Sequence, residues 1–342
     1  MTDMKPFLKA IILLSLCFTF GICTAQYKES HPEFQPDSEL KPSFTVLLYP
    51  KGQSVDEGIV ENGQRITLGP SEDNGLRGEE TMTKLGKRSN IGNDARMDFY
   101  FPKKHNGQLV ICCPGGGYKN LSVFNCGVYE AEWLVNEGCV ACVLKYRMPM
   151  GHHTIPLQDV QNALRYCRHH AQKWGVNQIG VMGDSAGGHL ASSASTMYVD
   201  QNTRPDFAVL LYPRITLRRG GEKVSTKNCL LKPDSCWDNN VVEHERLIKH
   251  YSPDTHVSSD TPPTIIFLSA DDKLVPATNM IPYYTKLIEN KVHTELHVYP
   301  EGGHGWGFGG ERYKGKGKDK FINYRPEFYL TLSRWLKEQR NQ

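Results

Sequence analysis

The side chain best suited to act as a nucleophile is that of Ser185, at the centre of the sequence Gly-Asp-Ser-Ala-Gly over residues 183–187. The apolar residues 179–182 before it predict a strand, and residues 190–194 after it predict a helix. A serine on a sharp strand-to-helix turn is held in a strained, exposed position, and glycines flank it because larger side chains would collide with the strand and the helix. We therefore predict that Ser185 is a nucleophile on such an elbow.

A serine hydroxyl needs a base, and the base needs an acid that holds its tautomer. Residues 264–268 predict a strand, and Asp272 follows it at the start of the next connection. The chain has 13 histidines, and His304 combines a late position with a glycine-rich loop after the strand predicted at residues 294–299. We predict Asp272 as the acid and His304 as the base, with Asp271 as the alternative acid.

Acyl transfer also needs hydrogen-bond donors where negative charge develops on the substrate oxygen. Three consecutive glycines, Gly115, Gly116 and Gly117, follow a strand predicted at residues 109–113. Glycines let backbone N–H groups turn toward a ligand without steric cost. We predict that the N–H of Gly116 or Gly117, together with that of Ala186, forms this oxyanion hole.

The elements that must position these residues form an α/β pattern. From residue 108 onward, short apolar runs alternate with amphipathic helical patterns, which predicts a mostly parallel central sheet with helices on both faces. Most runs are continuously apolar, as in strands buried on both faces. Strands are expected at residues 44–49, 97–101, 109–113, 139–146, 178–182, 207–212, 264–268 and 294–299. Helices are expected at residues 160–174, 276–290 and 327–340.

Residues 214–263 interrupt this alternation, because they separate two predicted strands and contain few periodic apolar residues. An insertion at this point favours a cap or lid over the carboxyl ends of the strands. A surface insertion without a functional role is the alternative. We also expect a long loop over residues 51–93 and a Lys/Gly-rich solvated loop over residues 311–320.

The amino terminus has the pattern of a secretory signal, with Lys5 and Lys9 before an apolar run over residues 10–22 and small residues up to Ala25. This run is shorter than the roughly 20 residues of a spanning helix, so a short membrane anchor is the weaker alternative. We predict a secreted or periplasmic bacterial protein without stable membrane insertion. The expected organisation is a signal peptide at 1–25, a linker at 26–43 and one catalytic domain at 44–342 with the insertion at 214–263.

Ten cysteines are present, and eight remain after the predicted cleavage. Most lie in apolar runs and are expected to be buried thiols. Cys229 and Cys236 bracket a polar loop, and the sequence leaves open whether they form a disulfide. No Cys/His spacing fits a zinc finger or ribbon, and the pair His152-His153 lacks a carboxylate at ligand spacing, so we predict no metal site.

The overall charge excludes some classes of partner. The formal net charge is +3 over 342 residues, which gives no field strong enough to favour nucleic acid. An apolar content of 39% is that of a globular protein. Three aromatic residues near the predicted loops, Tyr118, Trp237 and Trp306, could stack on a sugar or an aromatic group, or pack in the interior.

Taken together, five motifs resemble the esterase/lipase branch of the α/β-hydrolases. They are PGGGY at 114–118, LKYRMP at 144–149, GDSAGGHLA at 183–191, Asp272 before Val275-Pro276, and Gly303-His304-Gly305. Over roughly residues 49–335 the chain most resembles bacterial acetyl xylan esterase-like proteins. The resemblance implies an α/β-hydrolase fold and a triad of Ser185, Asp272 and His304 with no cofactor. Asp184 is a departure, since this group often carries Phe before the serine.

The activity that the resemblance implies is that of a serine ester hydrolase that works through an acyl-enzyme. With export, it favours deacetylation of xylan or its oligosaccharides, hence a small-molecule or oligosaccharide ester as substrate. A feruloyl or general carboxylesterase is the alternative. A serine peptidase of the prolyl-oligopeptidase type is less favoured, because the chain has no room for the propeller domain of that group. An exported carbohydrate-binding protein is the non-enzymatic alternative.

Overall fold

The computed structural model describes residues 35–50, 58–76, 79–218, 225–310, 312 and 319–341. The predicted signal peptide at 1–25 and the first part of the predicted linker lie outside these ranges. Most of the loop expected at 311–320 lies outside them as well. Within the described ranges, no helix has both the length and the apolar character needed to cross a membrane.

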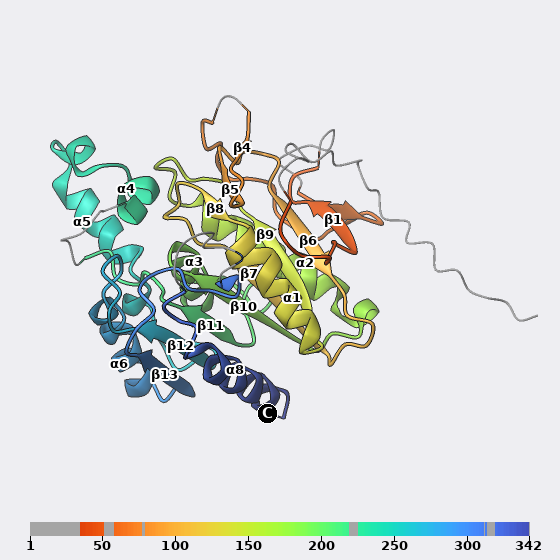
Figure 1. Cartoon of the computed structure of the whole chain (residues 1–342). Helices are drawn as coiled ribbons and strands as arrows, with labels where there is room; N and C mark the ends of the chain where they lie inside the picture. The colour runs from red at the N-terminus through yellow and green to blue at the C-terminus, as the bar shows by residue number, and fades with distance from the viewer. Residues whose placement is uncertain are drawn as a thin grey trace, which may run out of the picture.

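The centre of the fold is an eight-stranded sheet in the order β1-β6-β9-β7-β10-β11-β12-β13 (Figure 1). Its strands are β1 (Phe44–Leu47), β6 (Arg96–Tyr100), β7 (Gln108–Cys113), β9 (Val140–Lys145), β10 (Gln178–Asp184), β11 (Ala208–Leu211), β12 (Thr264–Ser269) and β13 (Thr294–Tyr299). The pairs β1–β6 and β6–β9 are antiparallel, and the other five pairs are parallel. The predicted mostly parallel sheet of an α/β-hydrolase is confirmed.

Helices cover both faces of this sheet. They are α1 (Tyr129–Asn136), α2 (Ile155–Trp174), α3 (Ala186–Thr196), α6 (Ile281–Glu289) and α8 (Arg325–Arg340). Figure 1 shows α1 and α8 on the face toward the viewer and α2 and α3 behind the sheet. The rings of Trp133 in α1 and Tyr329 in α8 stack with centroids 5.7 Å apart, which joins the two front helices.

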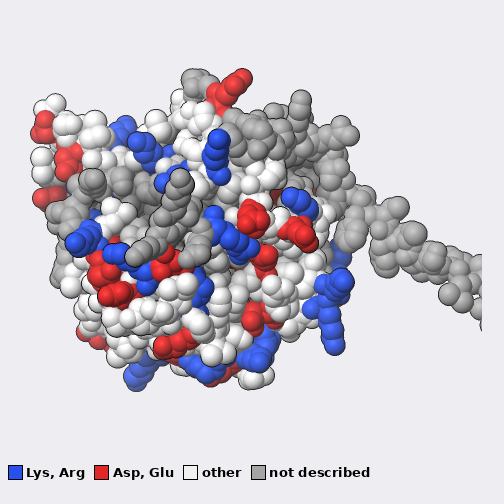
Figure 2. Space-filling model, viewed as in Figure 1, with Lys and Arg blue, Asp and Glu red and all other residues white. Residues whose placement is uncertain are grey.

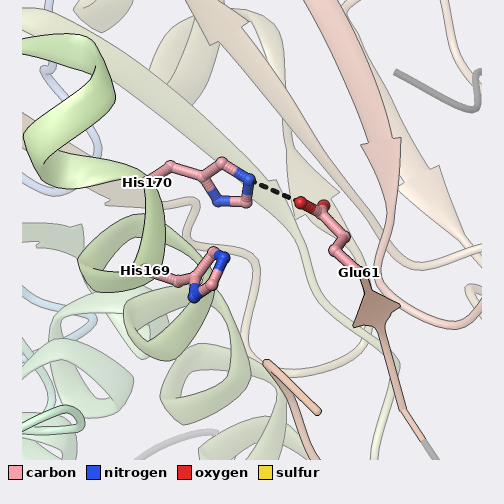
Figure 3. Close-up of side chains that lie close together, drawn as sticks. All are labelled: Glu61, His169 and His170. Carbon is pink, nitrogen blue, oxygen red and sulfur yellow. Dashed lines mark hydrogen bonds and ion pairs between the residues drawn. The ribbon is translucent and has the colours of Figure 1, made fainter. Parts of the chain in front are cut away.

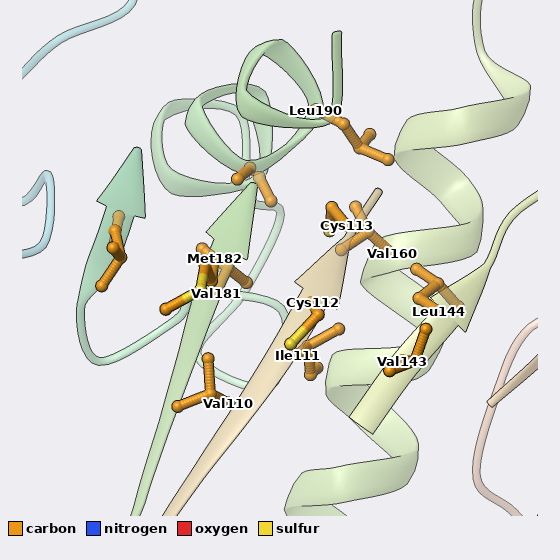
Figure 4. Close-up of a cluster of buried hydrophobic side chains, with 14 of the residues drawn as sticks. Val110, Ile111, Cys112, Cys113, Val143, Leu144, Val160, Val181, Met182 and Leu190 are labelled. Atoms are coloured by element: carbon orange, nitrogen blue, oxygen red, sulfur yellow. The ribbon is translucent and has the colours of Figure 1, made fainter. Parts of the chain in front are cut away.

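The core lies between the sheet and these helices. All six residues of β7 and all six of β9 are buried. Figure 4 shows apolar side chains of β7, β9 and β10 packed against Val160 of α2 and Leu190 of α3. Burial of apolar surface on this scale is the main force that fixes the strand ends where the chemistry is expected.

Two small sheets are formed by short strands that the sequence did not reveal, four of them between β1 and β6 and one after β7. A two-stranded sheet pairs β2 (Val60–Glu61) with β3 (Gln64–Arg65), and a three-stranded sheet has the order β4 (Thr81–Met82), β5 (Lys87–Ser89), β8 (Leu121–Ser122). Strands of two or three residues are too short to show a periodic pattern. The π-helical turn η1 (Phe124–Val128) and α1 were also not predicted.

The insertion between β11 and β12 is mostly helical. It contains α4 (Ser225–Leu231), η2 (Asp234–Trp237), α5 (Val241–His250) and η3 (Pro253–Thr255). Cys229 and Cys236 are both free thiols, so the disulfide that the sequence left open is not formed. Thr226 of α4 lines the same pocket as Ser185, which places the insertion beside the site described next.

Candidate active site

Ser185 lies on a strained turn between β10 and α3. Its φ is +53° and its ψ is −115°, a conformation that a residue with a side chain adopts only under constraint. A Cβ on Gly187 would lie 1.9 Å from the carbonyl oxygen of Cys113. The backbone N–H of Ser185 donates to the carbonyl of Leu211 at 3.0 Å. Close packing and backbone hydrogen bonding therefore hold the serine at the end of the strand.

The structure brings Ser185, His304 and Asp272 together in one chain of hydrogen bonds. His304 Nε2 lies 2.8 Å from Ser185 Oγ, and His304 Nδ1 lies 2.7 Å from Asp272 Oδ2. A carboxylate only accepts, so Nδ1–H donates to Asp272 and Nε2 is left to accept from the serine. In this arrangement the histidine can take a proton from Ser185.

Asp272 and Asp271 have different roles in the loop after β12. Asp272 Oδ1 accepts the backbone N–H groups of Leu274 at 2.8 Å and Val275 at 2.9 Å, which fixes the carboxylate toward His304. Asp271 Oδ1 accepts the N–H of Gly303 at 2.6 Å. The alternative acid therefore shapes the loop that carries the histidine, while Asp272 contacts its ring.

The glycine loop after β7 lies against the serine. Gly116 has a φ of +144°, and a Cβ there would lie 1.9 Å from the carbonyl oxygen of Asn120, so only glycine fits. Gly116 and Gly117 line the same pocket as Ser185. Within the described ranges, the N–H groups of Gly116, Gly117 and Ala186 donate to no other group. Unused donors beside a nucleophile have the chemistry of an oxyanion hole.

These groups open onto a pocket of about 450 Å³. Besides Ser185, His304 and the glycine loop, its lining includes Asn120, Asn125, Tyr212, Thr226, Leu274 and Val275. Three cationic residues, Lys87, Lys119 and Arg214, also line it, and its described lining holds no carboxylate. The surface elsewhere is mixed, since Figure 2 shows basic and acidic side chains interspersed over one face. The excess of cationic side chains is therefore a feature of the pocket lining and not of the viewed face as a whole.

Two of the three aromatic residues considered for substrate binding are buried away from the pocket. Trp306 is fully buried and stacks on Phe321 with ring centroids 3.8 Å apart. Tyr118 is 2% exposed. Of the two alternatives that the sequence left open, Tyr118 and Trp306 follow the second and pack in the interior. Trp237 donates its indole N–H to the carbonyl of Leu231 within the insertion and does not line the pocket.

His189 connects the elbow helix to the insertion. Its Nε2–H donates to the carbonyl of Tyr251 at 2.7 Å, which leaves Nδ1 to accept the hydroxyl of Tyr118 at 2.8 Å. Burial lowers the pKa of His189 to about 4, so the ring is neutral at pH 7. This histidine therefore positions α3 and is not a second base.

Beneath the triad lies a pair of buried acids, of which the sequence analysis missed Glu130. Glu130 of α1 and Asp184 of β10 are both fully buried, and burial raises the pKa of each. The hydroxyl of Tyr212 donates to Asp184 Oδ1 at 2.6 Å. The thiol of Cys112 lies within hydrogen-bonding reach of Glu130, and that of Cys126 lies within reach of Asp184. The negative charge of Asp184 raises the pKa of Glu130 further. A proton shared between the two carboxyls satisfies both.

This acid pair reaches the triad through Tyr212. The ring of Tyr212 meets the ring of His304 edge-on, with centroids 5.0 Å apart. Tyr212 also lines the pocket. Glu130 lies in a helix whose apolar pattern is too short to be recognised, and an acid on a buried helix face gives no sequence signal of its own.

The histidine pair considered for a metal is satisfied by other partners. His152 Nδ1 lies 2.5 Å from Glu72 Oε1, and His153 Nδ1 lies 2.7 Å from the hydroxyl of Tyr251. Among the described residues, one group of three possible ligands does lie together, namely Glu61, His169 and His170. None of these three lines the pocket of Ser185.

Comparison with known proteins gives a consistent family. A family model named BD-FAE matches residues 97–287. The acetylxylan esterase of Xylanibacter ruminicola is 36% identical over 255 residues, which cover 72% of this chain and 49% of that protein. Endo-1,4-beta-xylanase B of Butyrivibrio fibrisolvens is 28% identical over 303 residues, which cover 80% of this chain and 45% of that protein. The chain thus spans about half the length of these relatives.

Solved structures agree with the sequence relatives. The acetyl ester-xyloside bifunctional hydrolase of Caldicellulosiruptor lactoaceticus superposes with a TM-score of 0.56 at 29% identity, covering 71% of this chain and 88% of that one. The carboxylesterase Cest-2923 of Lactobacillus plantarum superposes with a TM-score of 0.59 at 22% identity, covering 71% and 92%. The second likeness concerns the fold alone.

Proposed function

The chain belongs to the BD-FAE family of α/β-hydrolases, and from this premise we propose that it is an exported serine ester hydrolase that removes acetyl groups from xylan or its oligosaccharides. One observation carries the proposal. The hydrogen-bonded chain from Ser185 Oγ through His304 to Asp272 opens onto a pocket lined by unused backbone donors. These are the parts that acyl transfer to a serine needs.

The reaction starts when Ser185 Oγ attacks the ester carbonyl while His304 Nε2 takes the hydroxyl proton. The carbonyl oxygen becomes an oxyanion that accepts hydrogen bonds from the N–H groups of Gly116 or Gly117 and Ala186. Asp272 holds the imidazolium that has formed. As the tetrahedral intermediate collapses, His304 returns the proton to the leaving alcohol oxygen, which leaves an acetyl ester on Ser185.

Water completes the cycle. His304 takes a proton from a water molecule, whose oxygen attacks the acetyl-serine carbonyl in the same oxyanion site. Collapse of the second intermediate breaks the bond to Ser185 Oγ, and His304 returns the proton to the serine. The products are the free sugar hydroxyl and acetate, and no step requires a group beyond the chain and water.

The substrate assignment is supported by the relatives, since both a named acetylxylan esterase and a xylanase match most of this chain. A pocket of about 450 Å³ accommodates an acetyl group and the sugar that bears it. Export is supported by the pattern of residues 1–25, which resembles a cleavable signal. Feruloyl and general carboxylester hydrolysis are the competing activities of the same site.

The test is acetate release from acetylated xylo-oligosaccharides, with p-nitrophenyl acetate as a small ester and Ser185→Ala as the inactive variant. Ser71→Ala, at an exposed serine outside the pocket, is the matched control. We expect release from both substrates that depends on Ser185 and not on Ser71. Cleavage of the small ester alone would retain the triad and reject the xylan assignment. Equal activity in Ser185→Ala would reject the mechanism.

A further inference from the structure

A second group of chemically active side chains lies near the carboxyl end of α2, outside the pocket of Ser185. Glu61, in the short strand β2, faces His169 and His170, near the carboxyl end of α2 (Figure 3). One ligand atom from each residue can be chosen so that all three lie within 4.8 Å of one another. From this arrangement we propose that Glu61, His169 and His170 bind one divalent transition-metal ion, with zinc as the best-fitting ion.

The spacing of the two closest ligand atoms fits a shared ion. His170 Nε2 lies 3.0 Å from Glu61 Oε2. Two ligand atoms at zinc-binding distance in tetrahedral geometry lie about 3.3 Å apart. These two atoms therefore need a shift of only a few tenths of an ångström, which the partly exposed Glu61 side chain can supply. The three ligand atoms together lie within 4.8 Å, so the exposed side chain of His169 has to rotate further to reach a shared ion.

His170 is oriented as metal-binding histidines are. Its Nδ1 lies 2.9 Å from the backbone carbonyl of Tyr166, which only accepts, so Nδ1 carries the proton and Nε2 is directed at Glu61. The ring is buried and stacks on Trp174 with centroids 5.0 Å apart and an interplanar angle of 18°. Packing and this backbone hydrogen bond hold the imidazole of His170 in this orientation without a bound ion.

His169 supplies an accessible third ligand. It is exposed, and its ring lies 4.8 Å from that of His170 at an interplanar angle of 75°. Two imidazoles and one carboxylate form a donor set that suits zinc, copper or nickel, whereas magnesium and calcium prefer oxygen ligands throughout. Three protein ligands leave the fourth tetrahedral position to water.

The expected consequence is local cross-linking. Glu61 belongs to the β2–β3 hairpin, and the segment that follows the hairpin is joined to α2 by the hydrogen bonds of Leu68 with Asn162. A bound ion adds a bond between hairpin and helix, and it stabilises the folded chain because the unfolded chain does not hold the three ligands together. The site is separate from the pocket, so small-ester hydrolysis does not depend on it.

The test is isothermal titration of the full-length, untagged protein with zinc chloride in a buffer that does not chelate metal. We expect saturable binding of one ion per chain, at least about tenfold weaker in His169→Asn and in Glu61→Gln. His293→Asn, at another exposed histidine, is the matched control and keeps the wild-type affinity. Magnesium chloride gives no saturable binding at the same concentrations.

Thermal unfolding gives a second readout. Zinc raises the midpoint of the wild type and of His293→Asn, and leaves that of His169→Asn unchanged. Turnover of p-nitrophenyl acetate without added metal confirms that each variant is folded. Absence of saturable zinc binding, or equal affinity in the wild type, His169→Asn and Glu61→Gln, would overturn the proposal and leave His170 and Glu61 as an ion pair only.

Discussion

Two acidic regions lie near Ser185, and their carboxyl groups have different partners. Asp272 is buried and accepts two backbone N–H groups and the ring N–H of His304. Asp184 and Glu130 are fully buried, and the hydroxyl of Tyr212 donates to Asp184. The N–H donors around Asp272 fix its carboxylate toward the base. Burial and the negative charge of Asp184 raise the pKa of Glu130, which favours a proton between the two buried carboxyls.

The contrast teaches that proximity to a nucleophile does not define a catalytic acid. What distinguishes Asp272 is its contact with the histidine ring and the two backbone N–H groups that hold its carboxylate in place. The following predictions test this difference, beginning with the largest expected effect.

Asp272→Asn should lower kcat for p-nitrophenyl acetate by about ten thousand-fold, because the amide no longer holds His304 in the tautomer that accepts the serine proton. Asp271→Asn is the matched change one residue away, and it should lower kcat by less than about tenfold, because asparagine keeps an oxygen that accepts the N–H of Gly303. Steady-state kinetics measure both. Similar losses in the two variants would remove the distinction between the two aspartates.

Glu130→Ala should destabilise the protein by about 2–4 kcal/mol, because it opens a cavity and removes the carboxyl group that hydrogen-bonds to Asp184. Glu130→Gln should cost much less, since its amide N–H can donate to Asp184. Urea unfolding at pH 5 measures the difference. Equal losses in the two variants would show that the hydrogen bond across the acid pair is absent.

The stability of the wild type should also depend on pH through Glu130. Its pKa is raised in the folded state by burial and by Asp184, so the folded chain keeps a proton that the unfolded chain releases above about pH 4.3. The contribution of this proton is complete below that pH and is lost as pH rises toward the folded-state pKa. As pH rises above the unfolded-state value, we expect the stability of the wild type to fall relative to that of Glu130→Gln. Parallel stability curves for the two proteins would contradict the shared proton.

Tyr212→Phe tests the contact between the buried acid pair and His304. The change removes the hydroxyl that donates to Asp184 and keeps the ring that packs against His304. We expect a loss of about 1–2 kcal/mol in stability, with kcat reduced by less than about tenfold. A larger loss of kcat without a loss of stability would place the hydroxyl in the reaction itself.

The smallest expected effect concerns the cationic side of the pocket. Lys87→Gln combined with Lys119→Gln should leave kcat for p-nitrophenyl acetate unchanged. It should raise KM for an ester that carries a carboxylate by about two- to fivefold at low salt, because exposed charges act weakly and are screened. Added salt should reduce the difference between the variant and the wild type. A KM that is independent of both lysines and salt would show that the charge does not act on the substrate.

The sequence was informative where chemistry follows strand ends. Ser185, Asp272 and His304 each follow a strand of the parallel part of the sheet, and the carboxyl ends of parallel strands meet at one edge, so their meeting could be predicted. Burial of individual aromatic side chains could not, and for that reason the sequence left open whether Tyr118 and Trp306 pack in the interior. Their neighbours, such as Phe321 against Trp306, come from distant segments.

The residues that the sequence missed share one property, namely partners far along the chain. Glu130 of α1 contacts Asp184 of β10. Glu61, in a hairpin of two-residue strands, lies beside His169 and His170 of α2. Spacing rules for metal or acid pairs examine neighbouring positions. Contacts of this kind become visible only when the fold is known.

The central claim is that an acyl group passes through Ser185, and the most direct measurement is to locate that group. The wild-type protein and Ser185→Ala are mixed with p-nitrophenyl acetate, quenched in acid during turnover, and mapped by peptide mass. We predict one acetyl group on the peptide that carries Ser185, absent from the variant and from protein quenched after the ester is consumed. Turnover by Ser185→Ala, or an acetyl group carried through turnover on another residue, would contradict the account.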